Sequence, residues 1–173
     1  DWRSGGAPSL EGNDPFGHRL WIQHEEPDTY RRTARFIEPL DYLNARFTGR
    51  VAASQTSMLL SWLTDNRTLD PGTYDPTLLR LAGVDPATLP PLVPTGSTVG
   101  TVTDAVAAEL GLPLGLPVVT ALPDLLSATL GSGAIELFEA HLSISTSSWI
   151  GCHAPKKVTS IGTQMATVPS ALP

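Results

Sequence analysis

Asp124 is the carboxylate whose setting in the sequence is most suited to chemistry. It follows the apolar stretch 117–122, with Pro123 between them, and precedes a segment rich in small residues. In open α/β sheets, ligands bind outside the carboxyl ends of the strands. A carboxylate there can take the proton from a substrate hydroxyl during phosphoryl transfer. The alternative is a structural role, since Asp is a preferred N-cap residue whose side chain accepts bonds from helix amides.

A second group of polar side chains follows about twenty residues later, in the stretch HLSISTSSW. Ser145, Thr146 and Ser147 offer hydroxyl groups and backbone amides at the tip of an expected hairpin. Successive amides of this kind form a nest that can cradle a phosphate. The alternative is an ordinary polar turn, because Ser is common in turns. Between the two groups, GSGA (131–134) suits either a hinge or a plain helix end.

The elements around these residues follow from the hydrophobic pattern. Residues 117–122 have almost no polar alternation, which predicts a strand covered on both faces, as in an α/β sheet. A short helix is expected over 125–130. The stretches 140–146 and 148–154 then read as two short strands of a hairpin.

The first half of the chain is predicted to be mainly helical. Helical spacing in 15–26 places Phe16, Leu20 and Trp21 on one face. In the same way, Leu40, Leu43 and Phe47 share a face of a helix over 39–48. Residues 51–63 are compatible with either a strand or a helical turn. The expected helix boundaries rest on Pro or N-cap residues at the starts and Gly at the ends, namely Pro39 to Gly49, Asp75 to Gly83 and Thr103 to Gly111.

Composition excludes several classes of function. The 173 residues carry a net charge of −6, which disfavours binding to nucleic acid or an anionic membrane surface. No apolar run approaches the length of a membrane span. The single cysteine, Cys152, fits a reducing compartment, is expected to be buried, and forms no internal disulfide or Cys-based metal site. The four histidines have no metal-ligand spacing, so no metal ligands are predicted. The opening DWRSGG, with neither a start Met nor a signal peptide, suggests a fragment or a processed chain.

Two long ordered stretches resemble the FGGY carbohydrate kinases, in particular the xylulokinase-like members. HRLWIQHEEPDTYRRTARFIEPLDYLNARFTGR is similar to the family's Trp, acidic-Pro and "DYL…LTG" passage. LLRLAGVDPATLPPLVPTGSTVGTVTDAVAAELGLPLGLPVV is similar to the segment that precedes the family's catalytic Asp. The resemblance implies an α/β chain that is part of a ribonuclease-H/actin-like two-lobe sugar kinase fold. It further implies that 1–133 are the end of the N-terminal, sugar-binding lobe and 134–173 the start of the C-terminal, nucleotide-binding lobe.

The same resemblance implies roles for particular residues. Asp124 corresponds to the general base and also contacts the sugar. Ser145, Thr146 and Ser147 correspond to a loop that binds nucleotide phosphates. Asp1 and Arg3 match a short substrate-binding segment. ATP with Mg²⁺ is the implied cofactor.

The expected function is therefore that of an internal fragment of an ATP-dependent kinase, cytoplasmic, acting on a ketose such as xylulose. The expected partners are the small-molecule sugar and ATP, with neither nucleic acid nor membrane. The family's N-terminal Asp-Gly-Thr motif and its C-terminal glycine-rich adenosine motif do not occur in these 173 residues. Two alternatives remain open: a non-catalytic sugar-binding relative, and an inactive truncated domain. The sequence does not specify the sugar or the oligomeric state.

Overall fold

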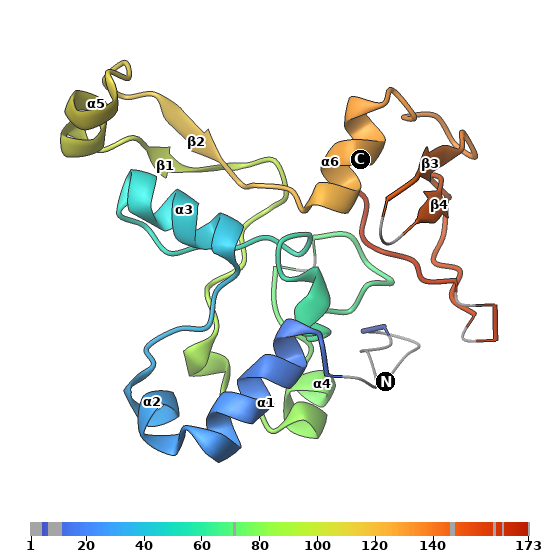
Figure 1. Ribbon diagram of the computed structural model, residues 1–173, viewed down its shortest axis with the longest axis horizontal. Helices are drawn as coiled ribbons and strands as arrows, with labels where there is room; N and C mark the ends of the chain where they lie inside the picture. The colour runs from blue at the N-terminus through green and yellow to red at the C-terminus, as the bar shows by residue number, and fades with distance from the viewer. Residues whose placement is uncertain are drawn as a thin grey trace.

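The computed structural model describes residues 5–6, 12–70, 72–145, 148–160, 162–163 and 165–172. Helices dominate the first half and two small sheets lie in the second half, so the expected mixture of helices and strands is confirmed (Figure 1). In chain order the elements are α1 (Pro15–Glu25), α2 (Pro27–Arg32), α3 (Pro39–Thr48), the 3₁₀ turn η1 (Leu59–Ser61), α4 (Pro76–Ala82), the 3₁₀ turn η2 (Pro86–Thr88), β1 (Thr98–Thr101), α5 (Asp104–Leu110), β2 (Pro117–Val119), α6 (Asp124–Gly131), β3 (His141–Ser143) and β4 (Trp149–Gly151).

The helix boundaries predicted from local signals are confirmed. At the start of α4, Oδ1 of Asp75 accepts bonds from the amides of Thr77 and Leu78, at 2.7 and 2.9 Å. These bonds satisfy two amides that have no partner within the helix. Helices α3, α4 and α5 all end at a glycine in the left-handed conformation, which costs a residue with a Cβ more than it costs glycine.

Strands β1 and β2 form an antiparallel ribbon, with Thr98 opposite Val119 and Thr101 opposite Pro117. The expectation that this second strand is covered on both faces is wrong. Pro117 and Val119 are exposed, and the described residues supply β2 with one neighbouring strand only. The outer surface of β2 is therefore not covered by other described residues, although the sequence of the strand is apolar.

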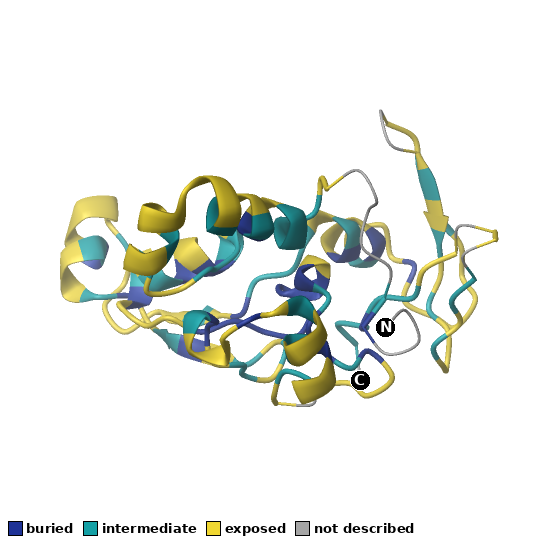
Figure 2. Cartoon of the chain, turned by 90° about the horizontal axis from the view of Figure 1, so that it is seen from below, coloured by how far each residue is buried: buried dark blue, intermediate teal, exposed yellow. Residues whose placement is uncertain are grey.

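The hydrophobic core lies in the middle of the molecule, where the buried residues gather in Figure 2. It is built from the segment before η1, from α4 and from the turn that follows it. Its buried members are Ala53, Met58, Leu63, Leu78, Val84 and Leu89. The stretch 51–63, which the sequence allowed to be either a strand or a helical turn, is mostly turn. Its apolar side chains form part of the core.

Helix α3 buries a polar face instead of the predicted apolar one. Asp41, Asn44 and Thr48 are buried, whereas Leu43 is more than half exposed. The amide nitrogen of Asn44 donates to the carbonyl of Val119 at 3.2 Å. Asn44 therefore satisfies a backbone carbonyl of the segment that packs against the helix. Helix α1 differs in a similar way, because Trp21 is exposed and the buried residue is Arg19.

The backbone of β1 approaches the end of α3 closely at Gly100. A Cβ added there would lie 3.2 Å from Cβ of Thr48 and 3.3 Å from Cδ of Arg50. Most real Cβ atoms have no contact this short. Glycine at position 100 therefore allows β1 to lie against α3, and β1 in turn carries β2.

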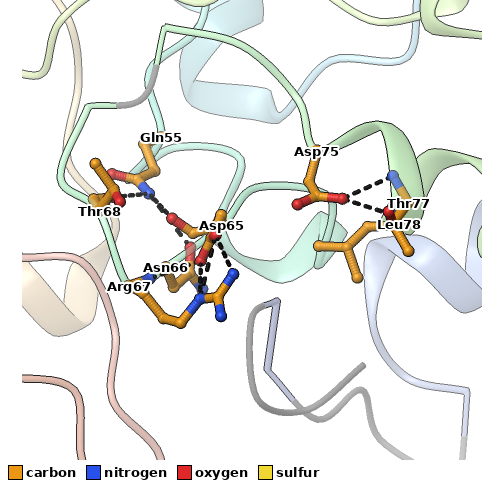
Figure 3. A network of polar contacts seen from close by, with 8 residues as sticks. All are labelled: Gln55, Asp65, Asn66, Arg67, Thr68, Asp75, Thr77 and Leu78. Carbon is orange, nitrogen blue, oxygen red and sulfur yellow. Dashed lines mark hydrogen bonds and ion pairs between the residues drawn. The ribbon is translucent and has the colours of Figure 1, made fainter.

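A buried amide holds the loop 65–70 in place (Figure 3). Gln55 is 2% exposed, and its Nε2 donates to the carbonyl of Thr68 at 2.9 Å. Its Oε1 accepts the backbone N–H of Asp70 at 2.8 Å. Within the same loop, Arg67 forms a two-pronged ion pair with Asp65. One side chain thus satisfies backbone groups at two points of the loop.

Candidate functional site

Asp124 is the first residue of α6, and Pro123 occupies the N-cap position. The side chain is exposed, and its Oδ1 accepts the N–H of Leu125 at 2.7 Å. Asp124 is thus not the N-cap residue of α6, although its side chain accepts the amide of the next residue as the structural alternative expected. The carboxylate lies where a strand has ended and a helix begins, open to solvent and to a ligand.

Helix α6 is held in place by buried residues that follow Asp124 in the chain. Leu126 and Thr129 are buried, at 5% and 7% exposure. The hydroxyl of Ser127 donates to the carbonyl of Leu122 at 3.3 Å, which ties the helix back to the segment before it. The first turn of the helix is therefore fixed on its inner side, while Asp124 remains on the outer side.

The glycine-containing stretch after α6 makes a turn toward the second small sheet. Ser132 caps the end of the helix, Gly133 follows with φ +85°, and Ala134 is buried. The hydroxyl of Ser132 lies 2.8 Å from Nδ1 of His141, at the start of β3. This contact joins α6 to β3 at the end of the helix that is remote from Asp124, about 12 Å away at 1.5 Å per residue.

Strands β3 and β4 form the predicted hairpin, with His141 opposite Gly151 and Ser143 opposite Trp149. The His141 and Trp149 rings are 4.9 Å apart, centroid to centroid. The expectation that Cys152 is buried is wrong, because its side chain is exposed just beyond β4. Two short strands without a third layer provide too little cover to bury it.

Of the three predicted phosphate-binding residues, Ser145 is described, and it follows β3 by two residues. Ser145 donates its N–H to Oγ of Ser148 at 3.3 Å, and that hydroxyl donates to the carbonyl of Ser145 at 3.0 Å. Ser148 thus closes the turn. Thr146 and Ser147 lie outside the described residues, as do Asp1 and Arg3. Of the predicted site residues, the structure therefore places Asp124, the first residue of α6, and Ser145, two residues after β3. Helix α6 and strand β3 are neighbours in Figure 1.

A cavity of about 420 Å³ lies elsewhere, between α1, the start of α3 and the turn around η1. It does not include Asp124. Arg19 in its wall is 5% exposed, and neither terminal nitrogen of its guanidinium has a hydrogen-bond partner among the described residues. The guanidinium lies over the Phe16 ring, 5.5 Å from the centroid. Burial lowers the pKa of Arg19, and nearby Tyr30 opposes the shift.

Two carboxylates at the start of α3 were missed by the sequence reasoning. Glu38 lines the same cavity, and burial raises its pKa against the opposing influence of His18. Asp41 is 1% exposed, and neither oxygen has a hydrogen-bond partner among the described residues. Asp41 lies three residues before Asn44 and seven before Thr48, both of which are buried. This helical spacing is the sequence signal for the polar face that the three residues share.

The described residues contain no cluster of three or more His, Cys, Asp or Glu side chains that could hold a metal ion. Within the same residues, none of the helices has the length and apolarity needed to span a bilayer.

Comparison with known protein families assigns the chain. The model of the N-terminal domain of the FGGY family of carbohydrate kinases matches residues 16–131. The chain belongs to the FGGY carbohydrate kinase family. The match covers α1 through α6 and thus includes Asp124, while the hairpin β3–β4 lies beyond it.

Curated relatives in this family include enzymes with different names. An autoinducer-2 kinase of Klebsiella pneumoniae is 34% identical over 116 residues, which are 67% of this chain and 21% of the relative. An L-fuculokinase of Escherichia coli K12 is 30% identical over 147 residues, which are 85% of this chain and 30% of the relative. The chain thus spans less than a third of the length of each of these relatives.

Solved structures show the same fold. A ligand-bound xylulose kinase from Lactobacillus acidophilus matches 98% of this chain and 34% of its own, with a TM-score of 0.85 and 19% identity. A xylulose kinase from Rhodospirillum rubrum matches 82% of this chain and 28% of its own, with a TM-score of 0.72 and 28% identity. These likenesses confirm the expected fold class: the chain is a part of the actin-like sugar kinase fold.

Proposed function

We propose that the protein containing this chain is an ATP-dependent carbohydrate kinase that phosphorylates a ketose such as xylulose. The observation that carries the proposal is the exposed Asp124 at the start of α6, inside the part of the chain that matches the FGGY family. Residues 1–133 are proposed to end the sugar-binding lobe, and residues 134–173 to begin the nucleotide-binding lobe.

In the proposed reaction, Asp124 accepts the proton of a sugar hydroxyl as that oxygen bonds to the terminal phosphorus of ATP. The bond from that phosphorus to the bridging oxygen breaks, and ADP leaves. Mg²⁺-ATP supplies the phosphoryl group and neutralises its charge. The carboxylate is suited to this because it is anchored through α6 and has no positively charged side chain bonded to it in the described part of the chain. Residues 145–147 are proposed to donate hydrogen bonds to nucleotide phosphates, and Asp1 and Arg3 to contact the sugar.

A matched pair of variants tests the role of Asp124. Asp104 is the control, because it is also an exposed Asp at the first position of a helix that follows a strand. The purified full-length protein is assayed for sugar-dependent ATP turnover, starting with D-xylulose. D124N is expected to lower kcat by about 10²- to 10⁴-fold, the usual size of general-base catalysis. D104N is expected to keep kcat within about twofold.

Retained turnover in D124N would remove Asp124 from the mechanism. The alternative function is a non-catalytic sugar-binding protein, favoured by the Pro and Leu that flank Asp124 where the family usually has glycine and a polar residue. That alternative predicts that a sugar raises the Tm while no phosphorylated product forms. Detection of a sugar phosphate by mass spectrometry rejects it. An inactive truncated domain would show neither effect.

A further inference from the structure

The segment that joins β2 to α6 is held at one residue, Thr120. The side chain is 4% exposed, and its Oγ1 accepts the backbone N–H of Gly96 at 2.7 Å. The N–H of Thr120 donates to the carbonyl of Ser97 at 2.9 Å. Just before it, the carbonyl of Val119 accepts the side-chain amide of Asn44. Thr120 thus bonds through both its backbone and its hydroxyl to the turn that enters β1.

That turn is itself fixed from the other side. Oδ1 of Asp70 accepts both the N–H and the hydroxyl of Thr95, at 3.1 and 2.9 Å. Asp70 has φ +45°, a conformation that is uncommon for a residue with a side chain. Its own N–H is held by the buried Gln55. A continuous set of hydrogen bonds therefore runs from Gln55 through Asp70 and the 95–96 turn to Thr120.

We propose that Thr120 is a positioning residue for Asp124. This inference rests on the proposed function. Asp124 lies four residues after Thr120, and between them the chain passes through Pro123, whose φ is fixed by its ring. The carbonyl of Leu122 within this connection also accepts the hydroxyl of Ser127. The connection is thus bonded near both of its ends, and a shift of its anchored start is transmitted to the carboxylate. Leu126 and Thr129 hold the other side of Asp124, so Thr120 and α6 together set where the carboxylate lies.

A positioning residue and a residue that only adds stability have different effects when they are substituted. A general base acts only when its oxygen is within about 3 Å of the proton that it takes, and small displacements are costly to the rate. Loss of the Thr120 hydroxyl should therefore lower kcat while leaving the KM for the sugar nearly unchanged. A residue that merely stabilises the fold would lower the Tm without such a split.

The test uses three variants of the full-length protein. T120V keeps the shape of the side chain and removes the acceptor for Gly96, whereas T120S keeps the hydroxyl. T48V is the matched control, since Oγ1 of the buried Thr48 also accepts a backbone N–H, that of Arg50 at 3.1 Å. For each variant, kcat and KM for D-xylulose and ATP are measured together with the Tm. Hydrogen exchange of a peptide covering 118–127 gives a second measurement that needs no substrate.

T120V is expected to lower kcat about tenfold, with KM for the sugar within about twofold and faster exchange over 118–127. T120S should keep kcat within about twofold, and T48V should lower the Tm without either effect. The inference is overturned if T120V keeps wild-type kcat or exchange, or if T48V loses as much kcat. The two proposals fail separately: an active D124N rejects the proposed function, while an inactive D124N with a fully active T120V rejects only this inference.

Discussion

The carboxylate of Glu38, one helical turn before Asp41, adds to the burial that raises the pKa of Asp41 to about 7. Burial is the larger cause. The nearby Ser57 hydroxyl, which donates to the carbonyl of Ser54, lowers the pKa of Asp41 by less than burial raises it. Asp41 therefore gains a proton in the folded protein at pH values where an exposed Asp would have lost it.

This shift predicts a specific pH dependence of stability. The ordinary pKa of Asp is 3.8, so between about pH 4 and 7 the folded protein holds a proton that the unfolded chain has released. Stability from this group is present at low pH and is lost as pH rises to about 7. The full effect is about 4 kcal/mol at 1.4 kcal/mol per pH unit. D41N is neutral at every pH, so its stability relative to wild type should rise by that amount between pH 4 and 8.

Chemical denaturation at pH 4, 6 and 8 measures this difference. D104N is the control, because Asp104 is exposed, and its stability relative to wild type should change little with pH. Parallel curves for D41N and wild type would show that Asp41 titrates as an ordinary exposed carboxylate.

Most substitutions of buried residues lower the stability of a protein, but replacement of Arg19 is expected to raise it. Its guanidinium is buried without a hydrogen-bond partner among the described residues, which is costly for a charge. R19M keeps a long side chain against Phe16 and removes the charge. We expect it to stabilise the protein by about 1–4 kcal/mol, the range found when buried ion pairs are replaced by well-packed apolar residues.

The Tm from thermal unfolding measures the effect of R19M. The control is R46M, since Arg46 is exposed on α3 and its replacement should change stability by less than about 0.5 kcal/mol. A lower Tm for R19M would mean that the guanidinium has a favourable partner in the full-length protein.

Gln55 gives a prediction that can be followed by proteolysis. Q55L leaves the N–H of Asp70 and the carbonyl of Thr68 without their partner, at a cost of about 1–3 kcal/mol for each buried group. The loop 65–70 should then open more often. Arg67 lies in this loop and is exposed, so trypsin should cut after it at least about tenfold faster than in wild type.

Digestion at low trypsin concentration, followed by mass spectrometry, identifies the cut. Q23L on α1 replaces a Gln outside this network and should leave the rate unchanged. Equal cutting after Arg67 in Q55L and wild type would argue that the ion pair with Asp65 alone holds the loop.

The features predicted well from the sequence are those set by neighbouring residues. Asp75 and Gly83 bound α4 because capping and left-handed ends act within a few residues. The hairpin at 141–151 was found for the same reason. These signals do not depend on what packs against the element.

Burial was predicted less well, since it depends on distant contacts. The polar face of α3 is inside because Asn44 reaches the carbonyl of Val119, 75 residues away. The strand β2 is exposed because it has one neighbour in place of the layers that its apolar sequence suggested. The position of Asp124 between a strand and a helix was predicted from the hydrophobic pattern, but the bond from Gly96 to Thr120 could not be read from the sequence.

The close approach of Gly100 to Thr48 couples the evolution of these two positions. A side chain at position 100 would collide with Cβ of Thr48 unless the helix end moved away. A smaller residue at position 48 would relieve only the part of the contact that involves its Cγ2, 3.4 Å away. Cδ of Arg50, 3.3 Å away, is unaffected by a change at position 48, so a side chain at position 100 also requires Arg50 to move. Among homologues this pair should show epistasis rather than independent drift.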